Sequence, residues 1–112
     1  PTMAARVKNK LSIKNRKCVT YDIIFGCPGW VEGMILADNL IKAQVAKTIL
    51  VIGAETLSRV TDPHDRNRMI FADGAGAVVV KATDDENVGI ICVIVLIAHV
   101  GRMRFIKRIY CQ

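Results

Sequence analysis

Two continuous apolar runs constrain the fold of this 112-residue chain more than any other feature of its sequence. Thr48–Gly53 reads TILVIG and Ala75–Val80 reads AGAVVV, and neither run alternates between apolar and polar residues. Runs of this kind are typical of strands that are covered on both faces, as in α/β proteins with a largely parallel sheet. We therefore expect a layered arrangement in which helices cover the sheet.

Further patterns alternate with these runs. Ala4–Leu11 has the spacing of a short amphipathic helix, and Pro28–Ala43 predicts a helix that is apolar nearly all round and so lies inside the molecule. Cys18–Phe25 is rich in β-branched and aromatic residues and predicts another strand, and a last strand is expected to begin at Val88. The order predicts an α/β fold, and such apolar strands lead us to expect that the natural protein continues on both sides.

Composition and charge exclude several classes of protein. With 52% hydrophobic and 23% charged residues, the chain is not a disordered segment. The apolar run at 88–100 is shorter than the roughly 20 residues of a membrane helix, so no membrane partner is expected. Most of the net charge of +6 lies in residues 92–112, which argues against a nucleic-acid-binding face across the domain.

The cysteines show no metal-site or redox-site spacing. They stand at positions 18, 27, 92 and 111, and no pair has the C-x-x-C pattern. We therefore predict no metal site. In a chain without a recognisable signal peptide, this usage indicates a reducing, cytoplasmic setting.

Cys27 is the strongest candidate for chemistry because it stands between a predicted strand and a predicted helix. Pro28 suits the first turn of that helix, and the unpaired N–H groups there carry about +0.5 charge, which stabilises a thiolate. Gly26 and Gly29 allow a tight turn and the close approach of a substrate, so the segment is a cysteine version of the nucleophile elbow. The alternative is a buried structural cysteine that follows a strand.

Four segments resemble type III β-ketoacyl-acyl carrier protein synthases in order and spacing, and the resemblance covers Pro1 to about Ile91. They are DIIFGCPGW at 22–30, VIGAETLSR at 51–59, DPHDR at 62–66 and FADGAGA at 71–77. The resemblance implies a thiolase-like fold, a layered α-β-α body with a mixed sheet, of which this chain is part of the N-terminal half. Residues 1–91 are then a partial half-domain carrying the nucleophile. Residues 92–112 form an atypical apolar and then basic tail, which a frameshift or a truncated reading frame would explain.

The resemblance also implies an activity, an acyltransferase reaction of fatty acid biosynthesis. Cys27 takes an acyl group from acyl-coenzyme A (acyl-CoA) as a thioester, and malonyl-acyl carrier protein then loses carbon dioxide and attacks it. Both are substrates, so no cofactor is expected. The backbone N–H of Cys27 forms half of an oxyanion hole. The parent enzyme is a homodimer, and the predicted strand Thr48–Gly53 with the helix before it belongs to the dimer contact.

Other residues follow from the same resemblance. Arg66 lies by the adenine of coenzyme A, unless it is an ordinary solvated arginine. Gly74 and Gly76 are structural, and Pro28, where small residues are usual, leaves the acyl-chain preference open. The family's catalytic histidine and asparagine have no counterparts here, since neither His64 nor His99 matches them, so this chain alone is expected to do no more than acylate itself.

Three alternatives remain open at this point. The first is another thiolase-fold condensing enzyme, of the hydroxymethylglutaryl-CoA synthase or polyketide starter type. The second is a non-catalytic interaction domain whose basic tail, from Arg102 to Arg108, binds an anionic membrane or RNA. The third is a redox or metal-binding thiol protein, against which the cysteine spacing argues.

Overall fold

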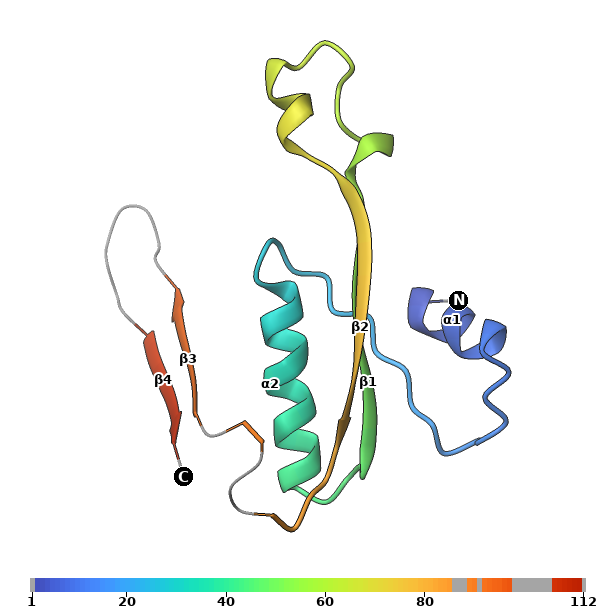
Figure 1. Ribbon diagram of the computed structural model, residues 1–112, viewed down its shortest axis with the longest axis vertical. Coiled ribbons are helices and arrows are strands. Elements are labelled where there is room, and N and C mark those ends of the chain that lie inside the picture. The colour runs from blue at the N-terminus through green and yellow to red at the C-terminus, as the bar shows by residue number, and fades with distance from the viewer. Residues whose placement is uncertain (1, 86–88, 91, 98–105, 112) are drawn as a thin grey trace.

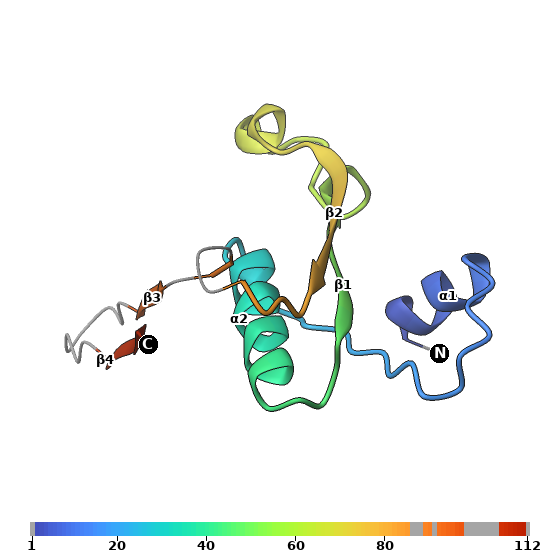
Figure 2. The same ribbon diagram turned by 60° about the horizontal axis from the view of Figure 1, so that its bottom comes forward.

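The computed structural model describes residues 2–85, 89–90, 92–97 and 106–111. Figure 1 shows a long strand pair that stands between two helices, and Figure 2 shows the same arrangement after a 60° turn. The elements in chain order are α1 (Met3–Lys10), α2 (Gly29–Lys42), β1 (Thr48–Thr56), the short 3-10 turns η1 (Leu57–Arg59) and η2 (Arg66–Ile70), β2 (Asp73–Lys81), β3 (Cys92–Ile97) and β4 (Ile106–Cys111).

Both predicted helices are confirmed with small shifts of their ends. The side chain of Thr2 caps α1 by accepting a hydrogen bond from Ala5 N at 3.3 Å. Pro28 stands at the N-cap of α2 and has no side-chain capping bond, so the first turn of α2 keeps N–H groups without a side-chain acceptor. The chain leaves α2 through Gln44, whose φ of 57° is the left-handed conformation common after a helix.

The predicted strands at 48–53 and 75–80 are confirmed as the longer strands β1 and β2, but they pair antiparallel, in a register that runs from Thr48↔Lys81 to Thr56↔Asp73. The apolar runs by themselves suited a parallel sheet, whereas the family resemblance implied a mixed sheet, with which an antiparallel pair is compatible. The two strands pair antiparallel because the connection at 57–72 holds only two short 3-10 turns and no crossover helix. Among the described residues, the outer edges of this two-stranded sheet have no further strand beside them.

Helix α2 packs on the face of β1 that carries Ile49, Val51 and Gly53, because every second residue of β1 is at least partly covered. A Cβ built on Gly33 would lie 3.1 Å from Val51 Cγ1, and one built on Gly53 would lie 3.1 Å from Trp30 Cδ1. A larger residue at either position would fit only if the facing side chain moved by a few tenths of an ångström. Since the start of α2 meets the later part of β1, the helix runs antiparallel to the strand.

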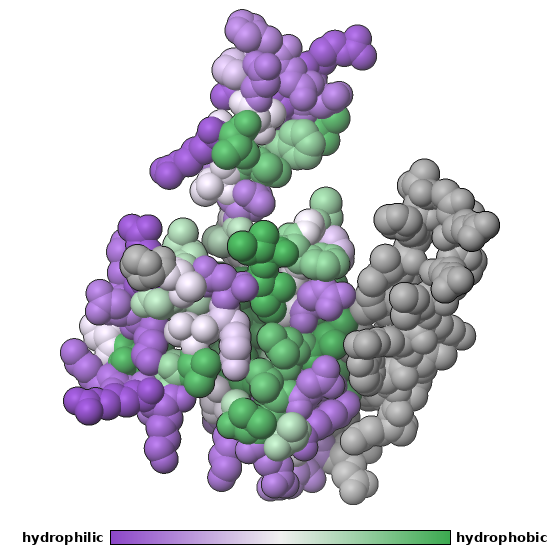
Figure 3. All heavy atoms as spheres, turned by 180° about the vertical axis from the view of Figure 1, so that it is seen from behind, coloured by the Kyte–Doolittle hydropathy of each residue, from purple (hydrophilic) through white to green (hydrophobic). Residues whose placement is uncertain are grey.

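The core within the described residues is small. Only Ala37 and Val51 are buried hydrophobic residues, with 1% and 8% of their surfaces exposed. The cover that the apolar strands and α2 were expected to need is not supplied by the described residues, since Val79 on β2 keeps 63% of its surface exposed. These strands stay exposed because one helix covers one face of β1. Figure 3 shows the apolar side chains gathered through the middle of the visible face.

The predicted strand at Cys18–Phe25 is also wrong, because this segment is extended but joins no ladder. Strands β3 and β4 form a separate antiparallel pair, in a register from Cys92↔Cys111 to Ile97↔Ile106. The predicted last strand begins at Cys92, and Val88, where we expected it to begin, lies outside the described residues. None of the helices in the described ranges has the length and apolar character needed to cross a bilayer.

Candidate active site

Cys27 lies in a tight turn immediately before α2. The N–H of Gly29 donates to the carbonyl of Gly26 at 2.8 Å, which closes the turn around Cys27 and Pro28. The cysteine is exposed, so the alternative of a buried structural cysteine does not hold for this chain. The element before it is an extended segment rather than the strand of the predicted elbow, whereas the helix after it stands where the sequence placed it.

The start of α2 presents free N–H groups to the turn that holds the sulfur. Two residues beyond Cys27, α2 begins a run of 14 residues without a side-chain cap, so its dipole and its free N–H groups face this turn. The backbone N–H of Cys27 has no acceptor among the described residues. The turn therefore offers an exposed thiol beside an unpaired N–H donor, which are the two groups that thioester exchange at a cysteine uses.

The antiparallel packing of α2 on β1 places this turn at the end of β1 from which the loop at 57–72 departs, as Figure 1 shows. Cys27 and Trp30 line an open hollow of about 1300 Å³ together with Gly74 and Gly76 of β2. Its walls extend as far as α1, so it is the hollow between elements of the fold rather than a pocket with the dimensions of one substrate.

The glycines predicted to be structural differ in what surrounds them. A Cβ on Gly29 would make an ordinary contact with Phe25 Cβ at 3.5 Å. Beside Gly26, Gly74 and Gly76 the space within 4 Å is empty of described atoms. The close packing against an active-site layer that we expected for Gly74 and Gly76 therefore has no counterpart among the described residues, and their structural role stays a prediction.

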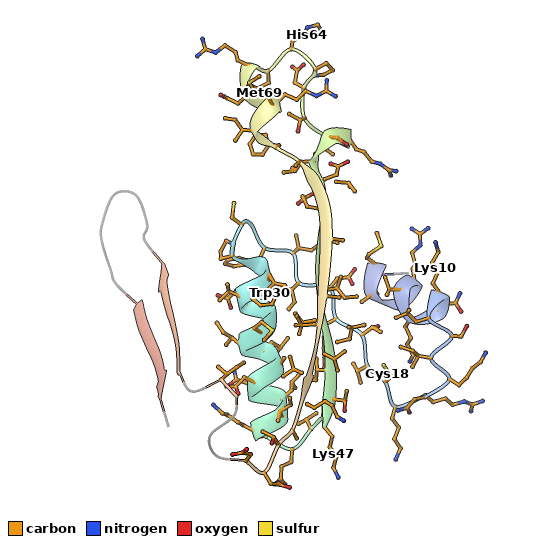
Figure 4. All side chains as sticks on the ribbon, viewed as in Figure 1. Lys10, Cys18, Trp30, Lys47, His64 and Met69 are labelled. Atoms are coloured by element: carbon orange, nitrogen blue, oxygen red, sulfur yellow. The ribbon has the colours of Figure 1, made fainter. Side chains whose placement is uncertain are left out.

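Arg66 begins η2 in the exposed loop at 57–72, and it does not line the hollow that Cys27 lines. The loop's acids serve its own turns, because Asp62 Oδ1 accepts from His64 N and Asp65 Oδ1 accepts from Asn67 N, both at 2.8 Å. Within the described residues Arg66 forms no ion pair. Its guanidinium is therefore available to a ligand. His64, exposed as expected, lies at the outermost end of the loop in Figure 4.

A pair that sequence analysis did not single out closes the base of this loop. Asp73 accepts hydrogen bonds from Ser58 Oγ at 2.5 Å and from Ser58 N at 2.8 Å, at the last rung of the β1–β2 ladder. These bonds, the one from the hydroxyl first, lower the pKa of the Asp73 carboxyl below its ordinary value. Serine and aspartate are common in turns, but their partnership across 15 residues cannot be read from the sequence.

This bond predicts a pH dependence of stability. Because the pKa of Asp73 is lower in the folded chain, the stabilising contribution is present above the unfolded pKa of about 3.9 and is lost as the pH falls through the folded pKa. The Ser58→Ala variant should therefore unfold at lower urea concentration than the wild type at pH 7, and the difference should shrink below about pH 4.

The control is Thr61→Ala, which removes another hydroxyl bond of the same loop, from Thr61 Oγ1 to the carbonyl of Leu57 at 2.7 Å. No carboxylate takes part in that bond, so its effect should not change with pH. Equal differences for Ser58→Ala at pH 7 and pH 3 would show that the Asp73 carboxylate is not involved.

In the part of the chain that the structure describes, no three His, Cys, Asp or Glu side chains come together in a way that would hold a metal ion. Cys18 is half-buried on the far side of the strand pair from α2, as Figure 4 shows, and its Sγ contacts the carbonyl of Val19 at 3.9 Å. The tail residues Arg102 and Arg104 and the second histidine, His99, lie outside the described residues. Of the two cysteines whose side chains the structure describes, Cys27 is the exposed one.

A sequence model of 3-oxoacyl-[acyl-carrier-protein (ACP)] synthase III matches residues 21–96, which is more than half of the chain and includes both Cys27 and Arg66. The chain belongs to the 3-oxoacyl-[ACP] synthase III family. The match confirms the family that the four motifs indicated and favours it over the other thiolase-fold condensing enzymes. It ends at residue 96, inside the segment 92–112 that sequence analysis set apart.

Curated relatives agree with this assignment to the synthase III family. The β-ketoacyl-[ACP] synthase III 1 of Vibrio vulnificus strain YJ016 is 44% identical over 89 residues, which cover 79% of this chain and 28% of the relative. The synthase III of Psychromonas ingrahamii is 45% identical over 89 residues, covering 79% of this chain and 27% of the relative. The chain thus spans less than a third of the length of these relatives.

Solved structures of synthase III enzymes show the same fold. The enzyme from Aquifex aeolicus matches with a TM-score of 0.76 at 36% identity, over 88% of this chain and 32% of that one. The enzyme from Thermus thermophilus matches with a TM-score of 0.75 at 30% identity, over all of this chain and 39% of that one. The predicted fold class, an α/β portion of a thiolase-like body, is confirmed.

Proposed function

We propose that Cys27 accepts an acyl group from acyl-CoA as a thioester, in the first half-reaction of a condensing enzyme of fatty acid biosynthesis. The observation that carries this proposal is an exposed cysteine, closed into a turn at the uncapped start of a 14-residue helix, within a chain of the synthase III family. A thiolate suits this role because it is both a good nucleophile and a good leaving group.

In the proposed step, the Cys27 thiolate attacks the thioester carbon of acyl-CoA, and the carbonyl oxygen takes up the negative charge. The unpaired N–H of Cys27 is one donor toward that oxygen. The intermediate then collapses, the bond from carbon to the coenzyme A sulfur breaks, and the coenzyme leaves as a thiolate that takes a proton from water. The acyl group remains on Sγ of Cys27.

For the whole enzyme we propose that malonyl-[ACP] then loses carbon dioxide, and that its carbanion displaces Sγ from the acyl carbon to give the β-ketoacyl product. We further propose that this enzyme works in the cytoplasm as a homodimer, without a cofactor. The exposed apolar residues on β1 and β2, such as Leu50 and Val79, support packing against further protein in that state.

The test is a direct labelling of the 112-residue chain. After incubation with acetyl-CoA, intact-mass spectrometry should show one added acetyl group, and peptide mapping should place it on Cys27. Treatment with neutral hydroxylamine should remove it, as expected of a thioester. Acetylation that resists hydroxylamine, or that is spread over lysines, would refute acyl transfer to this thiol.

We propose that Arg66 binds the adenine end of coenzyme A, because its planar guanidinium is exposed and has no carboxylate partner among the described residues. The Arg66→Ala variant should raise the half-saturating acetyl-CoA concentration roughly 5- to 10-fold, since a stacked guanidinium contributes about 1 kcal/mol or somewhat more. The maximal rate of labelling should stay unchanged.

Two variants make this result specific. Arg66→Lys keeps the charge and loses the flat stacking surface, so it should fall between the wild type and Arg66→Ala. Arg6→Ala removes an exposed arginine from α1 and should leave the half-saturating concentration as it is. If Arg6→Ala weakens binding as much as Arg66→Ala, the effect reports net charge alone.

A further inference from the structure

The segment that leads to Cys27 is held to the rest of the molecule by side chains instead of a ladder. From Val19 to Phe25 the described chain makes no backbone–backbone hydrogen bond. Its ties are Asp22, which accepts from Met3 N at 2.7 Å and from Ala4 N at 2.8 Å, and the carbonyl of Cys18, which accepts from Lys8 Nζ at 2.6 Å.

Asp22 is the tie nearest to the nucleophile. Its two carboxylate oxygens take the first two N–H groups of α1, which have no acceptor within the helix, and its negative charge lies at the positive end of the helix dipole. Charge-assisted bonds of this length are stronger than neutral ones. Asp22 therefore joins α1 to a point only five residues before Cys27.

On the other side of Asp22 the same segment meets α2. Ile23 Cδ1 lies 3.9 Å from a Cβ built on Gly33, and Phe25 Cβ lies 3.5 Å from one built on Gly29. Ile23 and Phe25 therefore lie beside the two glycines of α2, which limits where the segment lies. The directed hydrogen bonds nearest to Cys27 in this segment are those that Asp22 accepts.

We propose that Asp22 is a positioning residue for Cys27, because its carboxylate ties the extended segment to the first turn of α1 and so sets where the Gly26–Gly29 turn meets α2. This role rests on the proposed acyl transfer to Cys27. Asp22 does not touch the acyl group. It acts through the segment 22–27 on the place that the sulfur occupies when acyl-CoA arrives.

The test compares the wild type with Asp22→Ala and Asp22→Asn across a range of acetyl-CoA concentrations. Asp22→Ala should lower the saturating rate of acetylation of Cys27 about tenfold, since small misplacements of a reacting atom have effects of this size or larger. The half-saturating concentration should stay within about twofold. Asp22→Asn keeps one acceptor oxygen and should fall between the two, and far-UV circular dichroism shows which variants fold.

Thr2→Ala is the matched control, because Thr2 caps the same turn of α1 through Ala5 N but reaches no part of the segment that leads to Cys27. If Asp22 merely stabilises α1, the two variants will lower the acetylation rate alike and the proposal fails. An acetylation rate that is unchanged in Asp22→Ala would overturn it as well.

A second measurement does not depend on acyl transfer. The N–H of Gly29, bonded to the carbonyl of Gly26, should exchange with solvent faster in Asp22→Ala and as in the wild type in Thr2→Ala. Unchanged exchange at Gly29 would overturn the positioning role even if the wild type took up no acetyl group. If the wild type takes up no acetyl group while the Gly29 N–H exchanges faster in Asp22→Ala, the proposed function is refuted. That pair of results would still support the positioning role of Asp22.

Discussion

Replacing Cys27 with serine should reduce the uptake of acetyl groups from acetyl-CoA by roughly 10³-fold or more, which is the scale on which enzymes lose activity with their nucleophile. A serine hydroxyl is not ionised near neutral pH and needs an adjacent general base. The turn from Gly26 to Gly29 holds no such base, since its other residues are glycine and proline. The measurement is the intact mass of the chain at timed intervals after mixing.

The matched control is Cys18→Ser, because Cys18 is the other cysteine whose side chain the structure describes, and it is half-buried. This variant should be acetylated within about twofold of the wild-type rate, since the Cys27 turn is intact. If Cys18→Ser is no longer labelled while Cys27→Ser is labelled fully, Cys18 is the residue that takes up the acetyl group. That result would refute the assignment of Cys27 as the nucleophile.

Replacing Ala37 with aspartate should have the largest effect on stability. Ala37 is 1% exposed and stands one turn after Gly33 on the side of α2 that meets β1. A carboxylate there would be taken out of water, so we expect a loss of about 3 kcal/mol or more in the free energy of unfolding. Trp30, the single tryptophan, lies against Gly53 of β1, so its fluorescence should shift to longer wavelength as α2 leaves the strand.

Asn39→Asp is the control for this variant, because it adds the same charge to an exposed position of the same helix. It should change the urea midpoint of unfolding only slightly, by an amount equivalent to about 0.5 kcal/mol or less. If the tryptophan emission of Ala37→Asp stays as in the wild type, Ala37 is not part of the contact between α2 and β1.

What the sequence predicted well was local. The periodicity of residues 28–43 predicted α2 within one residue at either end, and the runs at 48–53 and 75–80 predicted the centres of β1 and β2. These elements follow from side-chain patterns that repeat over several residues. The position of Cys27 before a helix followed in the same way, since glycine and proline mark the break.

The sequence predicted poorly those features that depend on partners far along the chain, namely strand pairing and long-range hydrogen bonds. Cys18–Phe25 has the composition of a strand, but strand formation needs a neighbour to pair with, and the described residues supply none. The same limit explains why the apolar runs did not reveal that β1 and β2 pair antiparallel. The bonds of Asp22 to α1 and of Asp73 to Ser58 join residues 15 to 19 positions apart, and no repeating pattern reveals them.

The outer edges of β1 and β2, which have no strand beside them among the described residues, have a practical consequence. Each edge presents a row of backbone donors and acceptors that an extended segment of another molecule can satisfy, and the neighbouring side chains are apolar. Concentrated solutions of the chain are thus prone to cross-β aggregation, since the side chains that flank these edges include few charges to oppose it. An acylation assay therefore needs the chain at low concentration.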